Sequence, residues 1–136
     1  MVTNRTYSEL IERLKGAGLR PTRQRLALAK LLFGKGDRHT TAEKLHSEAR
    51  EADVGVSLAT VYNALNQFTE AGLLREVVVD ASRSYFDTNV SDHHHFYIES
   101  SGTLMDVDSS ALRLDSLPPP PDGREVERVD VIIRLK

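Results

Sequence analysis

Residues 57–74 constrain the fold of this chain more than any other stretch. They begin with Ser57, a preferred N-cap residue, and reach Gly72, a residue type that commonly ends helices. Between these two signals the apolar residues recur every three or four positions, which predicts an amphipathic helix. Its core-facing stripe consists of Leu58, Val61, Leu65 and Phe68.

The other face of this predicted helix carries small, hydroxyl and amide side chains and no charge before Glu70. A helix that only faces water usually carries Lys and Glu, whereas hydroxyls, amides and a tyrosine suit phosphates and the base edges of a major groove. We therefore favour DNA contact over an ordinary solvated face for Ala59, Thr60, Tyr62, Asn63, Asn66 and Gln67.

Three shorter helices are predicted before this one, and each starts at a capping signal. The signals are a capping box at 6–9, Thr22 directly after Pro21, and a second capping box at 40–43. The short joints between these helices indicate a helix-turn-helix arrangement. The apolar residues expected to face its core are Leu10, Ile11, Leu14, Leu26, Ala29, Leu32, Phe33, Ala42, Leu45 and Ala49.

Arginines crowd the start of the second predicted helix, at Arg20, Arg23 and Arg25. Cations near a helix N-terminus oppose the macrodipole, so an external anion such as DNA phosphate explains the cluster better than local stability does. The alternative is an ordinary solvated helix end. Charge is also divided along the chain: residues 1–75 carry a net charge of +4 and residues 76–136 a net charge of −6. This asymmetry indicates that only the first part meets a polyanion.

The second half of the chain reads as short strands. Residues 74–79 and 83–88 flank a turn at 80–82, and a hairpin after the DNA-facing helix predicts a winged helix. Further strands are expected at 93–99, 103–107 and 126–135. One or two helical turns are expected at 109–114, and a stiff proline-rich linker at 117–123.

These elements predict an α+β fold with two domains. Residues 1–89 form a winged-helix DNA-binding domain, and residues 90–136 form a small α/β domain for dimerisation and ligand sensing. A segment of about 45 residues buries too little surface to be stable alone, which predicts a homodimer.

The absence of cysteine excludes disulfides, thiolate metal sites and cysteine nucleophiles. Histidine and carboxylate side chains are then the strong metal ligands that remain. Residues 1–5 lead into a helical pattern without a signal-peptide core, and no apolar run approaches the length of a membrane span. We therefore expect a cytoplasmic protein.

Three consecutive histidines, His93, His94 and His95, lie in one of the predicted strands. Side chains alternate between the faces of a strand, so His93 and His95 should point one way and His94 the other. One site therefore cannot use all three. Imidazoles at this two-residue spacing can converge on one ion.

Four motifs together resemble the ferric uptake regulator family of bacterial metal-sensing repressors. They are residues 18–25, 39–45, 57–66 and 92–95, in order and spacing, and the likeness covers nearly the whole chain. Within the family the sequence is most similar to the iron response regulators of rhizobia and related α-proteobacteria, chiefly through the histidine run, residues 95–102 and a shortened C-terminus.

The resemblance implies a winged helix that binds an AT-rich palindromic operator in double-stranded DNA. Tyr62 would contact bases, and Arg20 the minor groove or backbone. Many relatives carry Arg where this chain has Asn63, so its base preference should differ. The predicted DNA-binding residues are Arg20, Thr22, Arg23, Ser57, Thr60, Tyr62 and Asn63.

The resemblance also implies ligands. The family's regulatory site maps onto His39, Asp87, His93 and His95, a donor set suited to Fe, Mn or Zn. The first cysteine pair of the family's structural zinc site falls at Ile98 and Ser101. Because neither residue is a cysteine, this structural zinc site cannot form. A second family site would need Asp92, His94 and further partners, although no histidine follows residue 95.

Haem is the other predicted ligand. The iron response regulators are thought to bind it through such a histidine run, which here means His93, His94 and His95. A haem-delivering enzyme is then a further candidate partner.

These observations predict a DNA-binding transcriptional regulator, mainly a repressor, of iron and haem homeostasis genes. The alternative within the family is a repressor that depends on Fe, Mn or Zn without sensing haem. Two readings from other classes are a metal- or haem-binding protein whose winged helix docks a protein, and an enzyme in which a histidine-bound metal activates water. We expect no enzyme, because the sequence offers no convincing general base beside the histidines.

Overall fold

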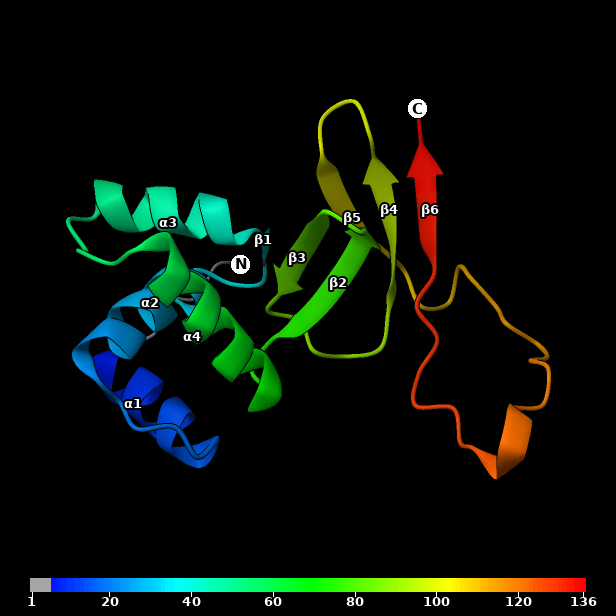
Figure 1. Ribbon diagram of the computed structural model, residues 1–136, viewed down its shortest axis with the longest axis horizontal. Coiled ribbons are helices and arrows are strands. Elements are labelled where there is room, and N and C mark those ends of the chain that lie inside the picture. Colours follow the sequence, from blue (N-terminus) through cyan, green and yellow to red (C-terminus); the bar gives the residue numbers. More distant parts are fainter. Residues whose placement is uncertain (1–5) are drawn as a thin grey trace. The chain divides into compact units, whose positions relative to one another are not determined.

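The computed structural model describes residues 6–136, and the expectation about residues 1–5 lies outside this range. The chain divides into two compact units, the first extending to Val90 and the second covering Ser91–Lys136 (Figure 1). None of the described helices combines the length and the apolar character that a membrane span requires.

Four helices build most of the first unit: α1 (Tyr7–Gly16), α2 (Arg23–Phe33), α3 (Ala42–Glu51) and α4 (Leu58–Glu70). A hydroxyl side chain caps the N-terminus of each helix by accepting a hydrogen bond from a backbone N–H three residues on. The four caps are Thr6, Thr22, Thr41 and Ser57. After α4, Gly72 has a φ of 82°, a conformation that suits glycine at a helix C-terminus.

The capping box predicted at 40–43 is wrong by one residue. The cap of α3 is Thr41, whose hydroxyl accepts from the backbone N–H of Lys44 at 3.1 Å. Thr40 is instead buried in a two-residue strand, β1 (His39–Thr40). The sequence did not predict β1, because two residues are too few to show an alternating pattern.

The sheet of the first unit has the strand order β1-β3-β2, with every pair antiparallel. Strands β2 (Arg75–Asp80) and β3 (Arg83–Asp87) form the predicted wing hairpin after α4. Strand β1 then adds to the free edge of β3, so that His39 lies directly opposite Asp87.

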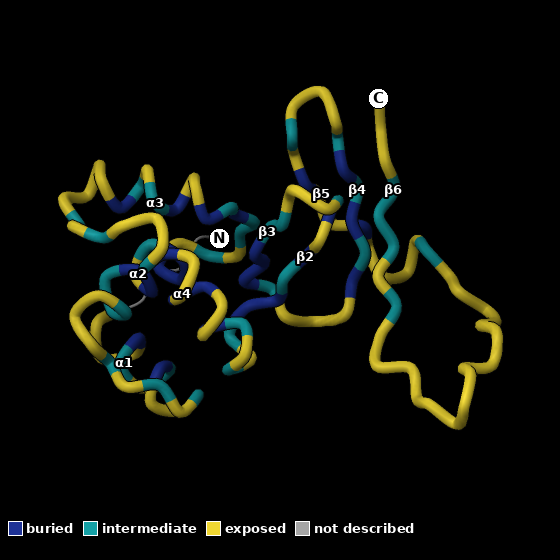
Figure 2. Tube along the Cα trace, viewed as in Figure 1, coloured by how far each residue is buried: buried dark blue, intermediate teal, exposed yellow. Residues whose placement is uncertain are grey.

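One apolar core joins the four helices to the sheet of the first unit, through residues such as Leu10, Leu45, Phe68 and Phe86. Three core predictions need correction, the first being Ile11 of α1, which is only partly buried. In α2 the fully buried leucine near the start is Leu28, while Leu26 is only partly buried. Leu58 is 36% exposed and the neighbouring Ala59 is exposed too, whereas Val61 of the same helix is buried (Figure 2 colours the chain by burial).

The second unit contains a three-stranded sheet in the order β5-β4-β6. Strands β4 (His94–Ile98) and β5 (Thr103–Val107) form an antiparallel hairpin, and β6 (Ile132–Leu135) pairs parallel with β4. The parallel ladder accepts only four residues, so the strand expected from residue 126 begins at Ile132.

The segment between β5 and β6 is mostly exposed. The helical turns expected at 109–114 are absent, and residues 109–111 form only a turn, braced by the carboxylate of Asp108. In the proline-rich stretch Pro120 has the predicted extended conformation, and a short 3-10 turn, η1 (Pro121–Gly123), follows it. Asp122 in this turn has a positive φ of 56°.

Candidate DNA-binding face and metal-ligand clusters

The outward face of α4 carries the polar residues that the sequence placed there. Asn63, Asn66 and Gln67 are exposed, and Tyr62 is 40% exposed. The Tyr62 hydroxyl donates a hydrogen bond to Oε1 of Glu43 in the first turn of α3, at 2.6 Å. The predicted face is therefore open to solvent, and its tyrosine is held from the side by a carboxylate.

This contact changes the acidity of both groups. The hydrogen bond from Tyr62 lowers the pKa of Glu43 below its usual value. The same bond raises the pKa of Tyr62, and desolvation adds to that increase. At neutral pH a neutral phenol therefore donates to an ionised carboxylate.

The arginine cluster at the start of α2 does not act as one group. The guanidinium of Arg25 donates to Oε1 of Gln67 at 3.0 and 3.3 Å and to the backbone oxygen of Arg20 at 3.0 Å. Arg25 thereby ties the start of α2 to the outer face of α4. An external anion is not needed to explain it, in contrast to our reading of the whole cluster. A groove beside the Arg25–Gln67 contact is lined by Arg20, Thr22, Thr60 and Asn63.

Two predicted DNA contacts already have a structural task. The hydroxyl of Thr22 accepts from the backbone N–H of Arg25 at 3.2 Å, and that of Ser57 accepts from the backbone N–H of Thr60 at 3.1 Å. Ser57 also donates to Oγ1 of Thr60 at 3.0 Å. Both caps orient the first turns of the helices that carry the other polar residues.

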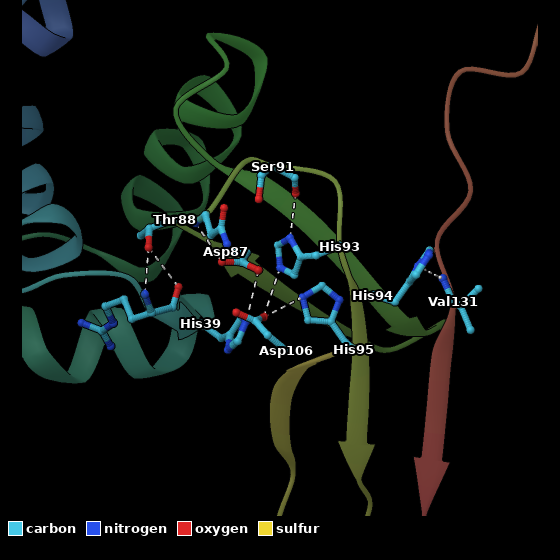
Figure 3. A network of polar contacts seen from close by, with 11 residues as sticks. His39, Asp87, Thr88, Ser91, His93, His94, His95, Asp106 and Val131 are labelled. Atoms are coloured by element: carbon cyan, nitrogen blue, oxygen red, sulfur yellow. Dashed lines mark hydrogen bonds and ion pairs between the residues drawn. The ribbon is translucent and has the colours of Figure 1, made fainter. Parts of the chain in front are cut away.

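In the first unit, two of the predicted metal ligands lie together. The register of β1 against β3 brings Nε2 of His39 to 3.1 Å from Oδ2 of Asp87 (Figure 3). The other oxygen of Asp87 accepts from the backbone N–H of Asn89 at 2.9 Å. The pair therefore offers one imidazole nitrogen and one carboxylate oxygen from neighbouring strands.

The strand that carries His39 is braced on both sides. The backbone N–H of Arg38 donates to Oγ1 of Thr88 at 2.8 Å, and the Arg38 guanidinium donates to both carboxylate oxygens of Glu48 at 2.8 Å. The charged hydrogen bond to Arg38 lowers the pKa of Glu48. This bidentate pair ties β1 to α3.

In the second unit, His93 and His95 converge on a carboxylate. Their Nε2 atoms lie 3.1 and 3.4 Å from the same oxygen of Asp106, and their ring centroids are 4.5 Å apart (Figure 3). Nδ1 of His93 lies 2.7 Å from the backbone oxygen of Ser91. Because a carbonyl oxygen can only accept, Nδ1 carries the proton, and in a neutral ring the Nε2 lone pair faces Asp106. A cation bound by both the Nε2 lone pair of His93 and the carboxylate of Asp106 would satisfy these two electron-donating groups.

His94 belongs to a different environment in the same unit. Its Nδ1 accepts a hydrogen bond from the backbone N–H of Val131 at 3.1 Å, on the side of β6. The predicted alternation of the three histidines is thus confirmed. Its cause is the strand geometry of β4.

The region around Asp92 and His94 gives little support to a second metal site. Both residues line a small cavity together with Arg128. The pKa of Arg128 is raised, chiefly by its hydrogen bond to Asp130, and the charge of Asp92 contributes. A permanent cation at this place disfavours a divalent ion. Within residues 6–136, neither Asp92 nor His94 joins a group of three or more possible metal ligands.

The profile of the ferric uptake regulator family matches residues 16–116 of this chain. The chain belongs to the ferric uptake regulator family. The predicted family is thereby confirmed, and its members are transcriptional regulators rather than enzymes, which agrees with our expectation for this chain.

Individual relatives give the same family. The chain is 37% identical over 98 residues to the peroxide operon regulator of Bacillus subtilis, an alignment covering 72% of this chain and 67% of that protein. It spans about two thirds of the length of such curated relatives. This relative is a peroxide regulator, so the narrower likeness to iron response regulators stays a prediction.

Solved structures confirm the predicted α+β fold, a winged helix followed by a small dimerisation domain. The ferric uptake regulator of Pseudomonas aeruginosa with manganese has a TM-score of 0.69 at 25% identity, covering 92% of this chain and 95% of that one. The ferric uptake regulator of Vibrio cholerae has a TM-score of 0.73 at 23% identity, covering 93% and 98%.

Sequence reasoning about this family member missed Asp106. The signal was available, because both strands of the hairpin and the turn between them were predicted. Pairing Ile98 with Thr103 places Asp106 opposite His95, which is the observed register. An acidic residue across from a histidine pair is a natural additional ligand.

Proposed function

We propose that this protein is a transcriptional repressor of iron and haem homeostasis genes that binds an AT-rich palindromic operator as a cytoplasmic homodimer. The observation that carries the proposal is the outward face of α4, which is polar, uncharged and exposed in a chain of this family. Direct contacts with double-stranded DNA are assigned to Arg20, Thr22, Arg23, Ser57, Thr60, Tyr62 and Asn63.

We assign divalent-metal binding to the predicted ligands His39, Asp87, His93 and His95, with Asp106 added from the structure. The donor chemistry supports the assignment. The second unit offers three donors around one point, while first-row ions take four to six ligands. His39 and Asp87 offer an imidazole and a carboxylate that already lie together. This set of nitrogen and oxygen donors suits Fe(II), Mn(II) or Zn(II).

A relative supports a divalent ion as the signal, since the structure of the Pseudomonas aeruginosa regulator contains manganese. A divalent ion that binds one conformation of the protein better than the others would favour that conformation. The ion would change operator affinity only by the difference between its affinities for the DNA-binding conformation and for the others. We therefore expect the divalent ion to support operator binding.

Haem is the second candidate signal, through His93, His94 and His95, and it would act in the opposite sense. The orientation of His94 supports haem binding, because its imidazole contacts Val131 and does not take part in the His93–His95 cluster. The cavity beside His93 and His94 measures about 200 Å³, below the range of roughly 300–1,000 Å³ for sites of drug-sized ligands. Haem would have to displace the surrounding chain, and we expect it to release DNA. A haem-delivering enzyme is then a further partner.

The test starts by selecting a duplex from a pool of randomised DNA with the full chain and measuring its affinity by gel shift. Titrations of Mn²⁺, haem and hydrogen peroxide then separate the candidate signals; peroxide is included because of the Bacillus subtilis relative. Binding to DNA should fall steeply with salt, which a protein-docking winged helix would not show.

Two variants locate the signals. Asp106→Asn should raise the Mn²⁺ concentration needed for DNA binding by about tenfold or more, whereas the exposed Asp115→Asn should leave it unchanged. The triple variant His93→Ala/His94→Ala/His95→Ala should lose haem-triggered release. Full release by the triple variant would place haem sensing elsewhere, and an absence of any sequence-selective duplex would reject the proposed function.

A further inference from the structure

The contact between Tyr62 and Glu43 lies at the edge of the proposed DNA-binding face. Both side chains are exposed, and they reach each other from two different helices, α4 and α3. The pocket next to them is lined by Asn66 of α4 and by wing residues such as Arg83. The contact therefore lies where a duplex seated on α4 and the wing would pass.

The hydrogen bond decides what the tyrosine can offer to a base. A carboxylate only accepts, so the phenolic hydrogen points toward Glu43 at a donor–acceptor distance of 2.6 Å. A short bond to a charged acceptor is stronger than a bond between neutral groups. The hydroxyl oxygen of Tyr62 then keeps only its lone pairs for an outside partner.

In a major groove, a tyrosine limited to accepting discriminates between base edges. Its oxygen can accept from the amino groups of adenine or cytosine, and its ring can pack on a thymine methyl. The keto oxygens of guanine and thymine offer it no hydrogen. A tyrosine without its carboxylate partner could rotate its hydroxyl to donate as well, and would discriminate less.

The charge of Glu43 has a second effect. A carboxylate at the edge of a DNA-binding face repels phosphate at every sequence, so it lowers non-specific affinity. Because this repulsion is the same at every sequence, it leaves the ratio of specific to non-specific binding unchanged, and only the orientation of the Tyr62 hydroxyl affects that ratio. Glu43 weakens contact with any duplex and orients the side chain that recognises the right one.

We propose that Glu43 is a specificity-determining positioning residue, which holds the Tyr62 hydroxyl as a hydrogen-bond acceptor toward the operator bases. The proposal rests on the proposed DNA-binding function. It predicts that Glu43 acts through Tyr62 and not only through its charge.

The experiment measures affinity for the selected duplex and for a scrambled duplex of the same composition, with and without Mn²⁺. Glu43→Ala should lower the ratio of the two affinities by roughly tenfold. Tyr62→Phe should lower it by a similar factor, and the double variant should show no further loss. Glu43→Gln should retain most of the ratio, because its amide oxygen can still accept the tyrosine hydrogen.

Glu76→Ala is the matched control, since Glu76 lines the same pocket and has no assigned contact with Tyr62. It should strengthen binding to both duplexes and leave their ratio unchanged. The proposal is overturned if Glu43→Ala behaves like Glu76→Ala, if the losses from Glu43→Ala and Tyr62→Phe add, or if Tyr62→Phe keeps the full ratio. A wild-type chain that selects no sequence would reject the proposed function itself, and this inference with it.

Discussion

The two units of this chain differ in how much apolar surface each encloses. The first unit packs four capped helices and a sheet around one continuous core, in which residues such as Leu65 and Phe68 are fully buried. Among the described residues of the second unit, the buried apolar side chains are Tyr97, Leu104 and Val107. Since burial of each large apolar side chain contributes about 1.5–3 kcal/mol, the first unit has far more to hold it together.

Because of this difference in buried apolar surface, the two units differ in how far each can be stable without a partner. The first has a continuous core of its own, and the residues proposed to contact DNA lie on helices that pack against this core. The second unit leaves large apolar side chains such as Met105 and Val126 about half exposed. A second copy of the chain and a bound ion would supply what its own sequence lacks.

We expect the full chain to be a symmetric dimer through residues of about 93–136, with a dissociation constant below the micromolar range. That corresponds to more than about 8 kcal/mol of association free energy. Sedimentation of the chain with and without Mn²⁺ measures it. Met105→Lys should weaken the dimer, whereas Val78→Lys in the wing should leave it intact. A monomer at micromolar concentration in both conditions would contradict the prediction.

Phe68→Ala should destabilise the first unit by about 3–5 kcal/mol, because it leaves a cavity in a core that cannot collapse around it. Denaturant unfolding followed by the helical circular dichroism signal measures the loss. Leu58→Ala provides the control: its side chain is 36% exposed, and we expect a change of less than about 1 kcal/mol. Equal losses for the two variants would show that the core was assigned wrongly.

Tyr62→Ala should cost roughly 1–3 kcal/mol of binding to the selected duplex without loss of fold. Arg20→Ala and Arg23→Ala should instead weaken all duplexes alike and lower the slope of the salt dependence by about one each. Gel shifts over a range of salt concentrations separate the two kinds of contact. Unfolding of the Tyr62 variant would mean that the ring supports the core.

Acid should remove the smallest contribution, the Arg38–Glu48 pair. The folded-state pKa of Glu48 is lowered, so its stabilising effect is present above the unfolded value of about 4.5 and is lost as the pH falls through the folded value. The side chains are partly exposed, which limits the effect to about 1 kcal/mol or less. Unfolding of wild type and Glu48→Gln between pH 3 and pH 7, roughly spanning this window, should converge at the acid end. A constant difference across that range would exclude the ion pair as the cause.

Local sequence signals sufficed for most of the first unit. Hydroxyl caps and glycine stops located its helices, and apolar spacing identified Val61, Leu65 and Phe68 as core. These features depend on residues within one or two turns of each other, so a linear reading can detect them. The same holds for the alternation of His93, His94 and His95, which follows from strand geometry alone.

Only the tertiary structure decided the features that depend on distant residues. Strand β1 exists because the edge of β3 accepts it, and this pairing moves Thr40 from a helix cap into the sheet. Register against a partner strand brought Asp106 to the histidines and limited β6 to four residues. The chain's own sequence determined that it has a capped-helix core, a polar helix face and candidate metal ligands with nitrogen and oxygen donors but no thiolates. Contacts such as Glu43 with Tyr62 and Arg25 with Gln67 required packing between helices, because their partners lie 19 and 42 positions apart.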